Sequence, residues 1–565
     1  MKKILFLFLM LLCLASCKED LSEYDKRIEQ RQAANAAMQG KIDALSKHNS
    51  EQTKRNADIQ AMLERVKLEG DALAAKLDSL EQSLIVPVEP KLLSMEFVST
   101  ENSDLTKNIA CEIVGDSIID CWLPAIMHEK YLIPRFTFDG TLVTIDDMEA
   151  ESGVSMFDFT KPVTVTVHTS ESSTSYRMFV HSYTGLPVIY ITTAGKRAIN
   201  SKDYYLKASF KLVEDVKTRG PGEVLSTSVN IKGRGNSSWK LPKKAYRLKF
   251  DEKISLLGEH KDKSWVLIPN YPDKSMIRNH TAGYMSSISL LDYTPKSHFV
   301  ELMLNGKYCG TYELCEKIKI SDHRVAVGDD GFLVEVDFRA VDEPDSRLFY
   351  TNYLENCINV KEPEVQYGDA NFEFIKNYIQ TTENVLFGSN FKDVNSGWQK
   401  YIDMDSFVDW YLINEISKNL DGLFYTSCFM NLQRGGKLKM GPVWDFDVAF
   451  GNISQANQTC YLPTGFYIKN IRWFARLFHD PAFVARVKER FNYFYDHKND
   501  IMNQINEDAQ YLRYSVDEND KVWHTLYNYT WTNYDIWGAY NNEVQSVKDW
   551  LEKRMNWLKG QFDQM

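Results

Sequence analysis

The chain has 565 residues, of which 44 % are hydrophobic, so it is long enough to hold several domains with large cores. Its 77 acidic residues outnumber its 66 basic residues and give a formal net charge of −11. This charge, without any basic stripe along the sequence, argues against nucleic acid as a partner.

A short basic and apolar segment opens the sequence. Two lysines at positions 2 and 3 precede an apolar run over residues 4–14. That run is too short to span a bilayer, which needs about 20 residues, and it predicts a signal peptide. The segment ends in LASC, residues 14–17, which resembles the lipobox of bacterial lipoproteins. The resemblance implies cleavage before Cys17 and lipidation of this cysteine. An ordinary signal peptide with an incidental cysteine is the alternative.

The lipobox resemblance sets the expected location. We expect an extracytoplasmic lipoprotein that is anchored in the outer membrane through Cys17. The next three residues, KED at 18–20, are all charged. They resemble the short tag that directs some lipoproteins to the cell surface.

Seven cysteines follow Cys17. Because this number is odd, at least one of them cannot pair within the chain. Cys111 and Cys121 could staple one small domain, and Cys309 and Cys315 could face each other across a hairpin.

Residues 18–86 have the pattern of a coiled-coil stalk. Between residues 21 and 84 there is no proline, and apolar residues recur in two sets seven residues apart. These sets combine into one apolar seam; they are Ile59, Val66, Leu73 and Leu80, and Leu63, Leu77 and Leu84. We therefore expect a homo-oligomer that forms through residues 21–84. A single helix that folds back on the body is the alternative.

Residues 87–186 alternate between apolar and polar side chains. The alternation and the Asp139-Gly140 turn predict a small antiparallel β-sandwich of immunoglobulin-like type. No cluster of catalytic residue types occurs in it, so we expect it to be a spacer.

The remaining residues, 187–565, form the largest predicted domain. Its first half is strand-like and includes a hairpin that turns at Asn305-Gly306, whereas helical patterns dominate after about residue 370. A strand-rich half followed by a helical half predicts an α+β, two-lobed arrangement.

The candidate chemistry begins with three aspartates. In GPVWDFDVAFG, residues 441–451, Asp445 and Asp447 end a predicted strand, whose alternation would point both to one side. Paired carboxylates suit Mg²⁺. Asp421 follows the predicted helix WYLINEISKN, and a carboxylate there together with an acidic pair is the layout of a phosphoryl-transfer site. The alternatives are a solvated hairpin end or a helix N-cap for the pair and a plain Asp-Gly turn for Asp421.

The first half of this domain supplies cationic residues. In KGRGNSSW, residues 232–239, two glycines flank Arg234, and such a loop can bring backbone N–H groups to phosphates. On the strand that follows, Lys244 shares a face with apolar residues, which suggests an inward lysine that needs an anion, whereas Lys243 and Arg247 share the other face. A plain turn and a solvent-facing basic strand are the alternatives.

Six segments occur together in this domain: RGNSSW, PKKAYRLKF, WVLIPNYPDKSMIRN, LNGKYCGTYELCEKI, NLDG and GPVWDFD. As a set they closely resemble the CotH family of spore-coat-type, atypical protein kinases, over roughly residues 190–560. The resemblance implies a distant protein-kinase-like fold that binds ATP with Mg²⁺ or Mn²⁺ and phosphorylates serines of partner proteins.

The resemblance also implies roles for individual residues. Asp421 would be the catalytic aspartate, and Asp445 with Asp447 would hold the metal. Lys244 or Arg247 would contact phosphate. The remaining nucleotide-site residues would be Arg234, Asn236 and Glu316, whereas Asp273 and Arg278 belong to a segment that resembles the lobe-bridging helix of the family.

Two features keep a second function open. Kinase-type sites place an asparagine about five residues after the catalytic aspartate as a second metal ligand, but Thr426 and Ser427 stand there in this chain. In addition, the predicted leader places the domain outside the cytoplasm, where ATP is scarce. The alternative to a kinase is therefore a non-catalytic surface protein that uses the same fold for adhesion or ligand binding.

Overall fold

The computed structural model describes residues 89–565 except 106, 125, 128, 129, 215–223, 454–457, 531, 532 and 534, and it also describes positions 38, 41, 54, 57, 60 and 62. The chain divides into two compact units, Met1–Glu89 and Pro90–Met565. The six described positions before residue 89 are helical and exposed. The predicted signal peptide, Cys17 and the heptad residues lie outside the described residues. No described helix is long and apolar enough to cross a membrane.

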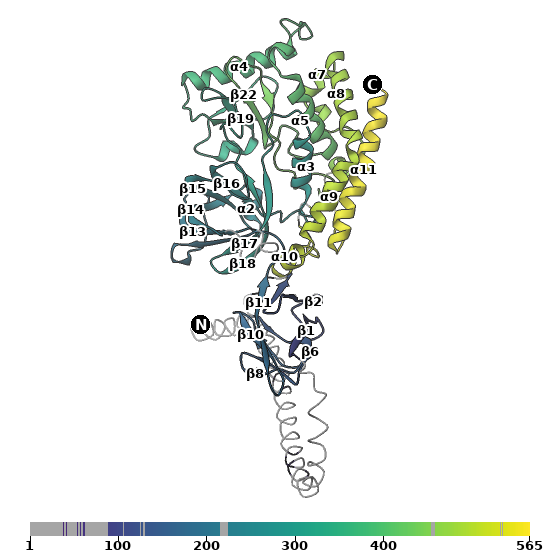
Figure 1. Ribbon diagram of the computed structural model, residues 1–565. Coiled ribbons are helices and arrows are strands. Elements are labelled where there is room, and N and C mark those ends of the chain that lie inside the picture. The colour runs from purple at the N-terminus through teal and green to yellow at the C-terminus, as the bar shows by residue number, and fades with distance from the viewer. Residues whose placement is uncertain are drawn as a thin grey trace, which may run out of the picture. The chain divides into compact units, whose positions relative to one another are not determined.

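The second unit begins with a small domain of β-sheets around one hydrophobic core (Figure 1). Its strands are β1 (Lys91–Phe97), β2 (Ile109–Ala110), β3 (Glu112–Val114), β4 (Ile118–Leu123), β5 (Tyr131–Leu132), β6 (Pro134–Asp139), β7 (Leu142–Ile145), β8 (Met148–Glu149), β9 (Phe157–Asp158), β10 (Val163–His168) and β11 (Ser173–Ser182). They form a three-stranded sheet of order β2-β1-β6, a six-stranded sheet of order β3-β4-β11-β10-β7-β8, and a β5-β9 pair.

The alternating pattern predicted correctly which side chains of this domain are buried, but one pair of strands runs in a direction that it did not predict. Val163, Val165 and Val167 on β10 are buried, as period-two alternation predicts. Strand β4 pairs with β11 in parallel, whereas we expected only antiparallel strands. The long segment 124–172 makes this possible, because parallel strands need a crossover of a dozen or more residues.

The next part of the unit is a closed β-barrel. Its strands are β12 (Val188–Thr193), β13 (Leu206–Val213), β14 (Val224–Arg234), β15 (Ala245–Ile254), β16 (Asp262–Ile268), β17 (Ser297–Leu304) and β18 (Lys307–Glu316), in the order β12-β13-β14-β15-β16-β18-β17. A parallel β12–β17 pair closes the barrel. The predicted turn at Asn305-Gly306 is confirmed: it joins β17 to β18, and both residues have positive φ.

The last part combines a five-stranded sheet with helices. The sheet has the order β20-β21-β19-β22-β23, and its strands are β19 (Phe332–Val336), β20 (Leu348–Phe349), β21 (Ile358–Glu362), β22 (Cys428–Leu432) and β23 (Lys439–Met440). The helices are α2 (Ser237–Lys240), α3 (Arg278–Ser287), α4 (Ala370–Phe387), α5 (Met404–Ser417), α6 (Gln458–Tyr461), α7 (Arg472–Leu477), α8 (Pro481–Asp496), α9 (Lys498–Leu512), α10 (Ser515–Trp523) and α11 (Tyr540–Asp563). Short 3₁₀ turns are η2 (Ala194–Lys196), η3 (Phe338–Asp342), η4 (Trp398–Lys400) and η6 (Ile468–Asn470).

Helix α5 lies at the centre of this part, with other helices around it (Figure 1). Other helices cover α5, so nearly all of its side chains are buried. Most of them are apolar, and its buried charged side chains are paired. Arg490 on α8 donates two hydrogen bonds to Asp409 at 2.7 and 2.9 Å. The fold is thus α+β, as the sequence predicted.

All seven cysteines after Cys17 are free thiols. The expectation that Cys309 and Cys315 face each other across a hairpin is wrong. Both lie on β18, because the hairpin turns at residues 305 and 306, before the first of them.

Candidate active site

Asp421 lies in the turn that follows helix α5. Lys418 ends the helix with a left-handed backbone, φ 47°. Its ammonium group donates hydrogen bonds to carbonyl oxygens in the segment 459–464, which holds the turn in place. A Cβ at Gly422 would come within 2.6 Å of Oδ1 of Asn414, so this position needs a glycine. The turn leaves Asp421 buried, with 8 % of its surface exposed.

Asp445 and Asp447 lie in a loop after β23. The prediction that a strand carries them is wrong, because β23 ends at Met440. Asp445 instead has a left-handed backbone, φ 67°, which bends the loop at this residue. Phe446, between the two aspartates, is buried in the core. A bend, and not strand alternation, therefore sets the direction of the two carboxylates.

The three carboxyl groups lie close enough together to shift one another's pKa. Burial, followed by the charge of Asp445, raises the pKa of Asp421 to about 8. Burial raises the pKa of Asp447 well above its usual value, and the charges of Asp445 and Asp421 raise it further. Burial also raises the pKa of Asp445, although Arg234 and Arg339 oppose the shift. Like charges held together in this way are stabilised by a bound cation.

The oxygen donors of this cluster fit a hard divalent cation. Within the described part of the chain, no group of three or more His, Cys, Asp and Glu could hold a metal ion on its own. Mg²⁺ commonly uses only one or two carboxylates and completes its shell with water and phosphate. Asp445 and Asp447 therefore fit a cation that is shared with a phosphate group.

One cationic side chain of the barrel, that of Arg234, lies beside this acidic cluster, and Arg247 lies near Arg234. The Arg234 guanidinium lies 5.7 Å from the ring centroid of Trp444 and opposes the pKa rise of Asp445. Nε of Arg247 is buried and has no hydrogen-bond partner among the described residues. Burial, followed by the charge of Arg247, lowers the pKa of Lys317 to about 8. These groups could bind a polyphosphate next to a cation held by Asp445 and Asp447.

Two of the predicted nucleotide-site residues have other partners. The ammonium group of Lys244 donates to the carbonyl oxygen of Trp239 at 2.8 Å. Oδ1 of Asn236 accepts a hydrogen bond from Lys202 at 3.3 Å. The expectation that Lys244 is the inward lysine is wrong, since Lys243 is fully buried and Lys244 is not.

The remaining predicted residue, Glu316, is also engaged. It is buried at the end of β18 and accepts hydrogen bonds from the hydroxyl of Tyr293 at 2.9 Å and the backbone N–H of Lys296 at 3.1 Å. Arg324 forms an ion pair with it at 3.4 Å. Glu316 therefore joins the end of the barrel to the segment before β17 and to the segment after β18.

The positions where a second metal ligand was expected face two different carboxylates. The hydroxyl of Thr426 donates to Oδ1 of Asp337 at 2.7 Å. The hydroxyl of Ser427 donates to Oδ2 of Asp445 at 3.5 Å. Ser427 is thus the residue of this pair that lies next to the acidic cluster.

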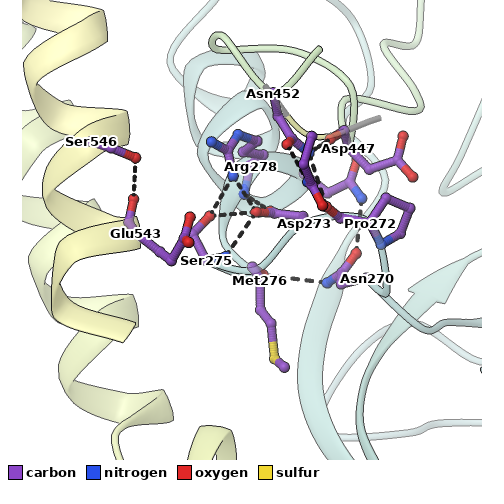
Figure 2. Close-up of polar contacts among 12 residues, drawn as sticks. Asn270, Pro272, Asp273, Ser275, Met276, Arg278, Asp447, Asn452, Glu543 and Ser546 are labelled. Carbon is purple, nitrogen blue, oxygen red and sulfur yellow. Dashed lines mark hydrogen bonds and ion pairs between the residues drawn. The ribbon is translucent and has the colours of Figure 1, made fainter. Parts of the chain in front are cut away.

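Asparagine side chains hold the loop after β23 that carries Asp445 and Asp447, and the sequence did not predict this role. Oδ1 of Asn279 accepts a hydrogen bond from the backbone N–H of Phe446 at 2.7 Å. Nδ2 of Asn452 donates to the carbonyl oxygens of Asp447 at 2.6 Å and Pro272 at 3.1 Å (Figure 2). The only sequence signal was the presence of Asn279 in the PDKSMIRN segment.

The segment before α3 joins the same network. Asp273 accepts hydrogen bonds from the backbone N–H groups of Ser275 at 3.0 Å and Arg278 at 2.9 Å, and it forms a buried ion pair with the Arg278 side chain (Figure 2). Its charge also contributes to the raised pKa of Asp447. The segment that was expected to bridge the lobes thus comprises the turn before α3 and the start of this helix, and Asn279 connects it to the loop that carries Asp445 and Asp447.

A family model described as CotH kinase protein matches residues 231–558, which is more than half of the chain. The chain belongs to the CotH kinase family. The match covers Asp421, Asp445 and Asp447, the cationic residues of the barrel and all of α3. The family is consistent with a requirement for a nucleotide and a divalent metal ion.

Other comparisons add little to this assignment. No curated protein matches the chain. A solved structure, that of a putative glycoside hydrolase from Bacteroides thetaiotaomicron VPI-5482, is 16 % identical with a TM-score of 0.15, and the match covers 40 % of this chain and 55 % of that chain. A likeness this low supports no inference about fold or activity.

Proposed function

We propose that this chain is a metal- and ATP-dependent protein kinase of the CotH type that phosphorylates Ser or Thr hydroxyls. The observation that carries the proposal is the cluster of the buried Asp421 and the half-buried Asp445 and Asp447, which interact electrostatically beside Arg234 of the barrel. When bound, ATP with Mg²⁺ or Mn²⁺ supplies the phosphoryl group and neutralises its charge.

Each side chain then has a defined task. Asp445 and Asp447 hold the cation, and Arg234 and Arg247 contact the phosphates. Asp421 orients the acceptor hydroxyl and takes its proton. With a cation on the neighbouring aspartates, the Asp421 carboxyl group would ionise at a lower pH, which leaves it free to accept that proton.

The test is transfer of labelled γ-phosphate from ATP by the full chain, with Mn²⁺ or Mg²⁺. Wild-type protein should incorporate label, and Asp421→Ala and Asp445→Ala should lose it. Glu507→Gln removes an exposed carboxylate of α9 and should keep full incorporation. A folded wild-type protein that incorporates no label with either metal would overturn the proposal and favour the non-catalytic surface protein.

The location and assembly of the chain complete the proposal. The lipobox motif supports a lipid anchor at Cys17 in the outer membrane, and the heptad pattern supports a homo-oligomer through residues 21–84. Globomycin, which blocks lipoprotein signal cleavage, should cause the uncleaved form to accumulate, and Cys17→Ala should abolish lipid labelling. Cross-linking of the full chain should yield oligomers that disappear when residues 21–84 are deleted.

A further inference from the structure

A cavity lies between the end of the loop that carries Asp445 and Asp447 and helix α11. Its volume is about 330 Å³, within the range of small-molecule pockets. Residues 450–452, 461 and 463 and the first half of α11 form most of its lining. Asn452, which bonds to the carbonyl oxygen of Asp447, is one of the lining residues.

An unpartnered donor lines this cavity. Arg278 has only 6 % of its side chain exposed, and one of its two terminal nitrogens, Nη1, donates hydrogen bonds to Asp273 and Ser275. Its Nε is buried and has no hydrogen-bond partner within the described residues. A buried N–H without an acceptor is costly, so a ligand that offers an acceptor here would be stabilised.

Acceptors also line this cavity. Glu543 of α11 projects toward the Asp273–Arg278 pair (Figure 2). One of its carboxylate oxygens accepts the backbone N–H of Trp537 at 2.8 Å. Asp535 and Asp549 add two more carboxylates to the lining.

Aromatic rings form the apolar part of the cavity. Trp537 is 48 % exposed, which is unusual for so large an apolar side chain. Trp550 packs against the loop, where a Cβ at Gly451 would come within 2.7 Å of its ring. Gly451 has φ 76°, so both its backbone and the close approach of Trp550 require a glycine.

A ligand of this cavity must therefore accept a hydrogen bond from Arg278, donate to the carboxylates and present an apolar face to the aromatic rings. Hydroxyl groups both donate and accept, and the C–H face of a pyranose ring is apolar. We propose that this cavity binds a neutral saccharide, with a hydroxyl oxygen on Nε of Arg278, hydroxyl protons on the carboxylates of α11 and a ring face on Trp537.

The need for an acceptor, and not net charge, argues against a cationic ligand, since three carboxylates and two basic residues line the cavity. Nε of Arg278 has no hydrogen-bond partner among the described residues, and a cation that only donates cannot satisfy it. A neutral ligand with hydroxyl groups can donate hydrogen bonds to the carboxylates and accept them from the basic side chains. This proposal does not depend on kinase activity.

The test is saturation-transfer NMR on the full chain with four methyl pyranosides, of glucose, galactose, mannose and N-acetylglucosamine. At least one should receive saturation, and Trp537→Ala should weaken its binding at least tenfold. Tyr204→Ala removes an aromatic ring of the barrel that is exposed to a similar degree, 53 %, and should leave binding unchanged.

Asp549→Asn separates a neutral ligand from a cationic one. The amide still accepts hydrogen bonds, so saccharide binding should change less than threefold, whereas a cation such as arginine methyl ester would lose much of its affinity. The proposal is overturned if none of the four glycosides receives saturation, if Trp537→Ala binds them as wild type does, or if arginine methyl ester binds in their place.

Discussion

Asn279 of α3 accepts a hydrogen bond from the backbone N–H of Phe446 at 2.7 Å, and this bond joins the helix to the loop that carries Asp445 and Asp447. Nδ2 of Asn279 in turn donates to Oδ1 of Asn270 at 3.0 Å, and Asn270 donates to Glu313 on β18 at 3.1 Å. Side-chain amides thus connect the barrel to the loop that carries Asp445 and Asp447. The geometry of the loop therefore depends on Asn279, which is not one of the proposed metal ligands.

We expect Asn279→Ala to weaken Mn²⁺ binding by about 10–100-fold, the usual effect of removing a group that orients metal ligands. Asn279→Asp keeps the acceptor for Phe446 and should lose less affinity. The measurement is a Mn²⁺ titration followed by EPR of the free ion. Asn506→Ala, an exposed change on α9, is the control. Equal affinities in Asn279→Ala and wild type would show that the loop does not need this bond.

The sequence predicted the parts of the site that depend on local pattern. Asp421 was expected after a helix, and the structure has it in the turn that ends α5. The apolar residues around Asp445 and Asp447 indicated burial, and burial dominates the pKa shifts of both. These features follow from residue type and spacing, which a single sequence contains.

Features that depend on distant contacts could not be predicted in this way. Period-two alternation assigned Lys244 to the inside, but β15 begins at Ala245, so neither lysine belongs to the strand. Lys243 is buried because Asn519 of α10, 276 residues away, accepts its hydrogen bond at 2.8 Å. Asn279 and Asn452 were missed for the same reason, since amide–backbone contacts between distant segments leave no periodic signal.

Lys243 should make the stability of the domain depend on pH. Burial lowers its pKa from 10.5 to about 7, so between these values the unfolded chain binds more protons at this residue than the folded chain does. The contribution of Lys243 to stability is therefore smallest below pH 7 and rises as the pH increases toward 10.5.

Urea unfolding of wild type and Lys243→Met at about pH 7 and pH 9.5 measures this contribution. Lys243→Met should be less stable at both values, because Asn519 loses its partner, and its deficit relative to wild type should be larger at the higher pH. Lys240→Met, an exposed change, controls for general charge effects. A deficit that is the same at both pH values would contradict the lowered pKa.

Arg554 should be one of the most sensitive positions for stability. It is fully buried on α11, and its guanidinium donates to Oε1 of Glu415 at 2.6 Å and to the carbonyl oxygens of Pro463 at 3.0 Å and Gly465 at 2.7 Å. Arg554→Met leaves these acceptors without their donor and Glu415 without its counter-charge. We expect a loss of about 3–5 kcal/mol in the free energy of unfolding.

The matched control is Arg472→Met. Arg472 forms an exposed ion pair with Glu355 at 3.6 Å, and its side chain is 58 % exposed. Such surface pairs contribute only about 0–1 kcal/mol. Denaturant midpoints of the two variants, measured side by side, compare their losses of stability. Similar losses in both would show that the buried network around Arg554 stabilises the fold no more than a surface ion pair does.

Cys111 and Cys121 should form a disulfide if the chain is exported, as its leader predicts. Strands β3 and β4 pair Glu112 with Asp120 and Ile113 with Ile119, and the same register places Cys111 opposite Cys121. The two thiols interact, and Cys121 raises the pKa of Cys111. Directly opposed residues of an antiparallel pair lie about 4.5–5.5 Å apart at Cα, which suits a disulfide.

Mass spectrometry of peptides prepared without reductant from exported protein should find residues 111 and 121 linked, with the other cysteines alkylated. Reduction, or Cys111→Ser with Cys121→Ser, should lower the free energy of unfolding by roughly 2–3 kcal/mol, because the closed loop is short. Cys309→Ser is the control, since Cys309 and Cys315 lie along one strand and cannot pair. If both Cys111 and Cys121 are alkylated in exported protein, either the register or the expected export is wrong, and peptide mapping of the N-terminus would tell the two apart.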